Sequence, residues 1–115
     1  MENFKGKVAV ITGAASGIGR GLADYCAQQE MKIVLADVEE KALSLTDSEI
    51  KSNGADTIAI VTDVSEIADV QSLAQKTIEA FGRVDLLFNN AGVATGSSLW
   101  ESSINDCHWV VGVNL

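Results

Sequence analysis

The chain has 115 residues, of which 47% are hydrophobic and 21% are charged, a balance typical of one folded domain. Eight basic against 16 acidic residues give a formal net charge of −8, which argues against binding to nucleic-acid phosphates or anionic membranes. We find no apolar run of membrane-spanning length and no signal-peptide pattern, and we expect a cytoplasmic protein. Cys26 and Cys107 follow no motif and are expected to be reduced thiols, and the single histidine, His108, gives no support to a metal site.

Short apolar runs rich in β-branched residues alternate along the chain with segments of helical periodicity. The runs predict four strands, at residues 7–12, 32–37, 57–62 and 84–88. Strands separated by helices predict right-handed crossovers and a parallel sheet. The expected fold class is therefore α/β, a Rossmann doubly wound parallel sheet with helices on both faces and strand order 3-2-1-4.

Helical spacing also predicts which sides of the connecting helices are apolar. In the first helix the expected apolar residues are Ile18, Leu22, Tyr25 and Cys26. The second helix covers residues 39–52 and has a weak pattern. The third helix has Ser65 as its expected N-cap and Gly82 at its end. Its apolar positions are Ile67, Val70, Ala74, Thr77 and Phe81.

A loop rich in Gly, Ser and Thr follows the fourth strand, and a further helical pattern follows the loop. This pattern runs through Trp100, Ile104, Cys107, Val111 and Leu115. Because no cap or glycine comes after it, we interpret residues 1–115 as a domain that is truncated inside this helix.

The turn between the first strand and the first helix, Thr12-Gly-Ala-Ala-Ser-Gly-Ile-Gly19, is rich in glycine. Glycines allow a sharp turn and the close approach of a bulky anion. The helix that begins there offers free N–H groups and a partial positive charge to a pyrophosphate, and Ser16 can add a hydroxyl donor. A plain connecting turn is the alternative. A Walker-type loop is excluded because Arg20 and Gly21 follow Gly19, so the turn predicts a dinucleotide site.

An aspartate, Asp37, ends the second strand. A carboxylate there can accept hydrogen bonds from both hydroxyls of the adenosine ribose, and it repels a 2′-phosphate. The next residues, Val38, Glu39 and Glu40, supply no positive charge. The pattern favours NAD over NADP, although a solvated aspartate at a strand end is the alternative.

These residues make the chain resemble the short-chain dehydrogenase/reductase family. The Thr-Gly-x-x-x-Gly-x-Gly spacing of residues 12–19 is similar to that family's glycine turn, and Asn89-Asn90-Ala91-Gly92 is similar to its second signature. Asp63-Val64 resembles its adenine-binding pair, and Val113-Asn114-Leu115 resembles the helix with its structural and catalytic asparagine. The resemblance implies an NAD(P)-dependent oxidoreductase that transfers a hydride between nicotinamide and an alcohol or ketone.

The resemblance implies roles for the matching residues. Asn89 would tie strand ends together, and Asn114 would hold a water of a proton relay as the one catalytic residue in the chain. The implied cofactor-binding residues are Gly13, Ser16, Gly17, Ile18 and Gly19 at the pyrophosphate, Asp37 at the ribose, Asp63 and Val64 at the adenine, and Asn90, Ala91 and Gly92 beneath the cofactor.

The family's catalytic serine and Tyr-x-x-x-Lys pair have no counterpart in these residues. Tyr25, the sole tyrosine, has Gln29 four positions on, and we interpret it as a core residue. We expect this segment to hold the cofactor without transferring hydride. The parent protein is expected to act on a small-molecule alcohol or ketone, without nucleic-acid or membrane partners, as a homo-oligomer.

Three alternatives stay open from sequence. One is a stand-alone, non-catalytic nucleotide-binding module. Another is an extended-type epimerase or dehydratase, whose usual Gly-x-x-Gly-x-x-Gly spacing is not seen here. The last is a Rossmann-like methyltransferase that binds adenosylmethionine, which the Asn-Asn-Ala-Gly segment disfavours.

Overall fold

The computed structural model describes residues 3–90 and 111–114. Its elements follow in the order β1 (Val8–Thr12), α1 (Gly17–Gln28), β2 (Lys32–Asp37), α2 (Glu40–Ser52), β3 (Asp56–Val61), α3 (Ile67–Phe81), β4 (Leu86–Asn89) and β5 (Val111–Asn114). All strand pairs are parallel, and the sheet order is β3-β2-β1-β4-β5. This order confirms the predicted Rossmann α/β fold and the strand order 3-2-1-4.

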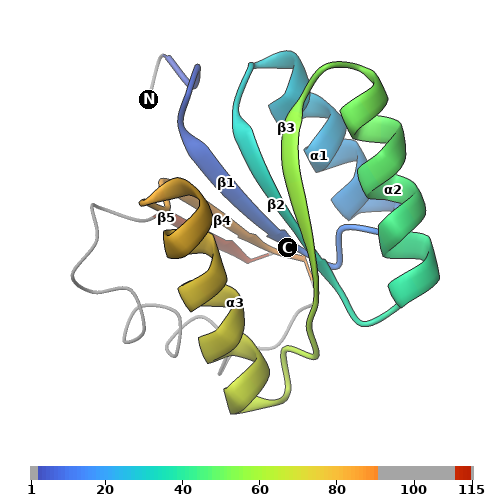
Figure 1. The fold of residues 1–115 in the computed structure, drawn as a ribbon, viewed down its shortest axis with the longest axis vertical. Coiled ribbons are helices and arrows are strands. Elements are labelled where there is room, and N and C mark those ends of the chain that lie inside the picture. The colour runs from blue at the N-terminus through green and yellow to red at the C-terminus, as the bar shows by residue number, and fades with distance from the viewer. Residues whose placement is uncertain (1–2, 91–110, 115) are drawn as a thin grey trace.

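The sheet is covered on both faces, by α1 and α2 on one side and by α3 on the other (Figure 1). Successive side chains of a strand point to opposite faces. Val8 and Val10 of β1 therefore pack with α3, whereas Ala9 and Ile11 pack with α1 and α2. Burial on both faces explains why β1 is an unbroken apolar run. Among the described helices, none combines the length and hydropathy that crossing a bilayer requires.

Helix α1 packs on the sheet through small residues. Its buried positions are Gly19, Ala23 and Cys26. The predicted apolar side was therefore wrong in part, since Ile18 is 66% exposed and Tyr25 is 50% exposed. Small side chains at this spacing bring the helix axis close to β1, and the larger apolar residues are left on the outer sides.

Helix α3 begins later than the sequence predicts. Its N-cap is Glu66, not Ser65. The Ser65 N–H and hydroxyl both donate to Oδ1 of Asp63, at 3.0 and 2.6 Å, so this serine closes a turn before the helix instead of capping it. The predicted end is confirmed, because Gly82 adopts a left-handed φ of 78° and its N–H donates to the Ile78 carbonyl.

The helix predicted to run from Trp100 to Leu115 is wrong over its last described residues. Val111–Asn114 form strand β5, which pairs with β4 so that Asn114 lies beside Asn89. The physical reason is that Val111 and Val113 are β-branched and alternate, and the edge of β4 offers unpaired backbone groups. Trp100, Ile104 and Cys107 lie outside the described residues, and truncation of the domain stays a prediction.

A buried carboxylate joins β1 and β4 at the amino edge of the sheet. Asp85 is 3% exposed, and its Oδ2 accepts the Val8 N–H at 2.8 Å, while its own N–H donates to the Val8 carbonyl at 2.9 Å. Nε of Arg83 donates to Oδ1 of Asp85 at 3.1 Å. These hydrogen bonds fix the register of β1 against β4, and both strands carry the candidate site at their carboxyl ends.

Candidate functional site

The glycine turn is organised around the carbonyl oxygen of Gly13. Gly13 has a φ of 65°, in the left-handed region that favours glycine. Its carbonyl accepts the Ser16 N–H at 3.2 Å, the Ser16 hydroxyl at 2.8 Å and Nδ2 of Asn90 at 3.1 Å. The Ala14 N–H donates to the Ala36 carbonyl at 3.1 Å. The turn is thus fixed by bonds from β2, from the end of β4 and from within itself.

The two glycines that open α1 stand in opposite surroundings. A Cβ atom added at Gly19 would lie 2.0 Å from the Gly13 carbonyl oxygen and 2.9 Å from Cα of Ala14. A Cβ added at Gly17 would meet no atom of the described residues within 4 Å. Gly19 is therefore needed for the close packing of helix on turn. Among the described residues, the space above Gly17 is open.

The amino end of α1 is suited to an anion. Its N-cap, Ser16, makes no side-chain cap hydrogen bond, and no acidic residue lies in the first turn. By contrast, α2 has Glu40 and α3 has Asp69 in their first turns. The first turn of α1 itself thus carries no carboxylate that would compete with a pyrophosphate for its N–H groups.

Asp37 lies beside the glycine turn and forms a hydrogen bond to its main chain. This residue is 9% exposed. Its Oδ2 accepts the Ala15 N–H at 3.0 Å, and its Oδ1 accepts the Glu39 N–H at 2.9 Å. The carboxylate thus ties the end of β2 to the turn after β1. Sequence reasoning assigned Asp37 to a ribose and missed this structural role.

A small cavity of about 100 Å³ opens between the ends of β1, β2 and β3. It brings together four predicted site residues and adds two that sequence reasoning missed, Val38 and Thr62. Val38 is 60% exposed although it is apolar, and this exposure is seen only in the structure. The lining residues are Gly13, Asp37, Val38, Thr62, Asp63 and Val64.

Asp63 is held with its carboxylate ionised at the edge of this cavity. Hydrogen bonds from the Ser65 hydroxyl and the Ser65 main chain lower the pKa of Asp63. Together with Asp37, it gives the cavity two carboxylates and no basic side chain. That charge favours hydroxyl and amino donors and disfavours a phosphate.

Asn89 and Asn90 come from the carboxyl end of β4. Oγ1 of Thr12 donates to Oδ1 of Asn89 at 2.9 Å, which confirms the interpretation that Asn89 ties strand ends together. Nδ2 of Asn90 donates to the Gly13 carbonyl and, at 3.1 Å, to Oγ of Ser16. Of the remaining predicted residues, Ala91 and Gly92 lie outside the described residues, and Asn114 is at the end of β5.

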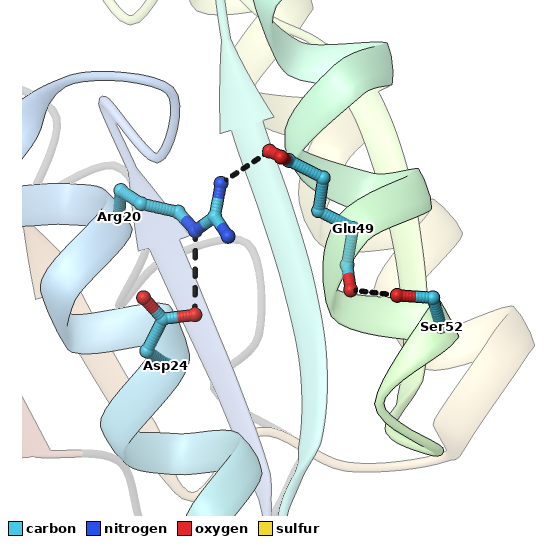
Figure 2. Close-up of polar contacts among 4 residues, drawn as sticks. All are labelled: Arg20, Asp24, Glu49 and Ser52. Atoms are coloured by element: carbon cyan, nitrogen blue, oxygen red, sulfur yellow. Dashed lines mark hydrogen bonds and ion pairs between the residues drawn. The ribbon is translucent and has the colours of Figure 1, made fainter.

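The nearest cation in sequence, Arg20, points toward Glu49 of α2 (Figure 2). Its Nη1 donates to Oε1 of Glu49 at 2.7 Å, and its Nε donates to Oδ1 of Asp24 at 3.3 Å. The hydrogen bond to Glu49 has the largest effect and, with the bond to Asp24, raises the pKa of the Arg20 guanidinium. Arg20 therefore links α1 to α2 and is not placed to neutralise a phosphate.

A larger hollow, of about 340 Å³, lies at the amino edge of the sheet. It is lined by the residues that follow α1 and α2, among them Glu30 and Gly54. The carboxyl ends of two helices bring partial negative charge there, which does not suit a pyrophosphate. Open α/β sheets bind ligands at the carboxyl edge, where the strand order reverses, and here that point lies between β1 and β4.

Comparison with known proteins identifies the family. The family model for short chain dehydrogenase matches residues 7–115. The chain is 40% identical over 115 residues to the CLA biosynthesis dehydrogenase/reductase of Lactiplantibacillus plantarum, covering 100% of this chain and 40% of that protein. It is 35% identical over 109 residues to a diacetyl reductase of Staphylococcus epidermidis, covering 95% of this chain and 42% of that protein.

A similar crystal structure is that of a short chain dehydrogenase/reductase from Burkholderia phymatum in complex with NAD. The TM-score is 0.88 at 39% sequence identity, and the match covers 97% of this chain and 50% of that one. The fold and the site thus define a dinucleotide-binding α/β protein. The chain belongs to the short-chain dehydrogenase/reductase family of oxidoreductases, and it spans half or less of the length of these relatives.

Proposed function

We propose that this chain is the NAD-binding half of a short-chain dehydrogenase that interconverts a small-molecule alcohol and ketone. The observation that carries the proposal is the position of Asp37, which is bonded to the glycine turn and lines the cavity next to it. A dinucleotide laid across the carboxyl edge meets both features at once.

The residues present fit such a cofactor. The open space above Gly17 and the amino end of α1, which has no acidic residue in its first turn, suit the pyrophosphate, together with Gly13, Ser16, Ile18 and Gly19. Asp37 suits the ribose, and Asp63 and Val64 suit the adenine. We further propose Asn90, Ala91 and Gly92 beneath the cofactor and Asn114 in a proton relay. When bound, the nicotinamide accepts or supplies the hydride.

The charges around the cavity support NAD over NADP. A 2′-phosphate placed at the ribose would face Asp37 and Asp63, while Arg20 is paired with Glu49 and Asp24. Like charges in a partly buried site cost free energy that no cation offsets here. We expect NAD to bind at least about tenfold more tightly than NADP, which corresponds to roughly 1.4 kcal/mol.

Calorimetric titration of both cofactors tests this preference. The matched variant is Asp37→Asn, which removes the charge and keeps one acceptor for the Ala15 N–H. It should narrow the gap between the two cofactors without unfolding the chain. Equal or tighter binding of NADP by the unaltered chain would refute the preference.

A second expectation concerns chemistry. The residues of this chain bind and orient the cofactor, but they include no Tyr-x-x-x-Lys pair to supply the acid and lower its pKa. We propose that the chain alone forms no NADH from NAD and a secondary alcohol, whereas the whole protein, as a cytoplasmic homo-oligomer, does. NADH formation by the isolated chain would contradict this expectation.

A further inference from the structure

The loop between β3 and α3 is held by a hydrogen bond to the carboxylate of Asp69, which does not line the cavity. Asp69 lies in the first turn of α3, and its Oδ2 accepts the N–H of Asp63 at 2.9 Å. Asp69 is not among the residues that line the cavity, whereas Asp63 and Val64 are. The helix therefore has a side-chain bond to the peptide unit on which the adenine side of the site depends.

The bond is well placed to fix the direction of the Asp63 side chain. One carboxylate oxygen of Asp63, Oδ1, accepts both donors of Ser65. Both main-chain groups of Asp63 are bonded as well. Its N–H donates to the Asp69 carboxylate, and its carbonyl accepts the Glu66 N–H at 3.0 Å. No hydrogen bond from the described residues reaches the other carboxylate oxygen, Oδ2 of Asp63.

The carboxylate of Asp69 lies in the first turn of α3. The amino end of α3 carries a partial positive charge, and a hydrogen bond from a backbone N–H to a carboxylate is stronger than one to a neutral acceptor. Hydrogen bonds from the Asp63 N–H to Asp69 and from the Glu66 N–H to the Asp63 carbonyl join the loop to α3. A loop that is held in this way loses less conformational entropy when a ligand binds.

We propose that Asp69 is a positioning residue for the adenine end of the cofactor site, which acts by holding the Asp63 peptide and through it the Asp63 carboxylate. The inference rests on the proposed binding of a dinucleotide. It adds that adenine affinity depends on a residue that does not touch the ligand. A purely structural Asp69 would instead affect every ligand alike, through the stability of α3.

Two fragments of the cofactor separate these roles, because AMP carries the adenine and nicotinamide mononucleotide does not. In Asp69→Ala the affinity for AMP and for NAD should fall roughly three- to tenfold, as expected from losing one hydrogen bond that orders the site. The affinity for nicotinamide mononucleotide should stay unchanged. Asp69→Asn, whose amide oxygen can still accept the Asp63 N–H, should bind AMP within about twofold of the unaltered chain.

The matched control is Glu79→Ala, which removes an exposed carboxylate from the same helix, where Glu79 accepts a hydrogen bond from Gln75. It should change neither affinity. The amide-proton chemical shift of Asp63 reports the bond itself, and it should move upfield in Asp69→Ala and little in Asp69→Asn.

The outcomes are distinguishable. If the unaltered chain binds neither NAD nor AMP, the proposed function fails, and this inference fails with it. If it binds both and Asp69→Ala binds AMP equally well, only the inference fails. A parallel loss for AMP and nicotinamide mononucleotide, accompanied by a lower Tm, assigns Asp69 to stability alone and also overturns the proposal.

Discussion

Gly19 and Gly17 should respond in opposite ways to the same substitution by alanine. In Gly19→Ala the new Cβ would lie 2.0 Å from the Gly13 carbonyl oxygen, so helix and turn must separate by about 1 Å to reach even the shortest tolerated contact of 3.0 Å. Overpacking of this kind costs about 1–3 kcal/mol. The shift also strains the bonds that Ser16 and Asn90 make to that oxygen, each worth about 1 kcal/mol. We expect a total loss of about 3 kcal/mol.

In Gly17→Ala the methyl group enters open space, and alanine favours the helix by up to about 1 kcal/mol. The folded state should be as stable as the unaltered chain or slightly more stable. The methyl group occupies the space proposed for the pyrophosphate, however, so NAD affinity should fall at least about tenfold. Gly21→Ala is the matched control. It places the methyl in equally open space one helical turn further on, and NAD binding should persist.

Urea unfolding and calorimetric titration with NAD measure both effects on the same three variants. We expect a stability defect in Gly19→Ala and a binding defect without a stability defect in Gly17→Ala. If Gly17→Ala binds NAD as tightly as Gly21→Ala, the pyrophosphate does not lie above Gly17. If Gly19→Ala is as stable as the unaltered chain, the close approach of α1 to the turn is not rigid.

Three further predictions concern the scaffold. Asp85→Ala leaves the Val8 N–H and the Arg83 guanidinium without their acceptor, so urea unfolding should show a loss of about 3 kcal/mol, and a loss below about 1 kcal/mol would refute the contribution of these buried hydrogen bonds. Burial raises the pKa of the Cys26 thiol from 9.0 to about 11. The folded state therefore favours the protonated thiol, and this contribution to the free energy of unfolding is complete below pH 9 and is lost as the pH rises toward 11. That alkaline loss, about 2–3 kcal/mol, should be absent from Cys26→Ala, and an identical pH profile would contradict it. Glu30 has a left-handed φ of 60°, so Glu30→Gly should stabilise the chain by up to about 1 kcal/mol in the same assay, and destabilisation would show that the residue is unstrained.

The central strands and their order could be predicted because local pattern and topology agree there. β1 and β2 lie between two layers of helices, so the interior residues of both strands are apolar without alternation. The glycine turn was found from its position between strand and helix. Asp37 was found from its place at the end of the next strand. Each of these signals is contained in a short stretch of sequence.

The details that were missed depend on contacts between distant residues. The buried side of α1 is made of Gly19, Ala23 and Cys26, and small residues give a weak hydrophobic signal although they permit the closest packing. Ser65 looks like an N-cap until its hydrogen bonds to Asp63 are seen. Strand β5 forms by pairing with β4, a contact between segments more than 20 residues apart, and the alternating Val111 and Val113 are too short a signal to predict it alone.

The second function of Asp37 could not be inferred either, because its bond to the Ala15 N–H spans 22 residues. The cavity residue Val38 was noted only for its lack of charge. A pattern for functional groups identifies what a side chain can bind. It does not show which main-chain groups that side chain already holds.

Amide chemical shifts recorded while NAD is titrated into the chain test the central claim most directly, namely that the carboxyl edge of the sheet is the dinucleotide site. We predict saturable shifts at the main-chain amides of the glycine turn, Gly13–Gly19, and at Val38, Asp63 and Val64. The amides of Gly6 and Gly54, in the hollow at the amino edge, should stay in place. Shifts centred on Gly6 and Gly54, or the absence of any saturable shift, would contradict the claim.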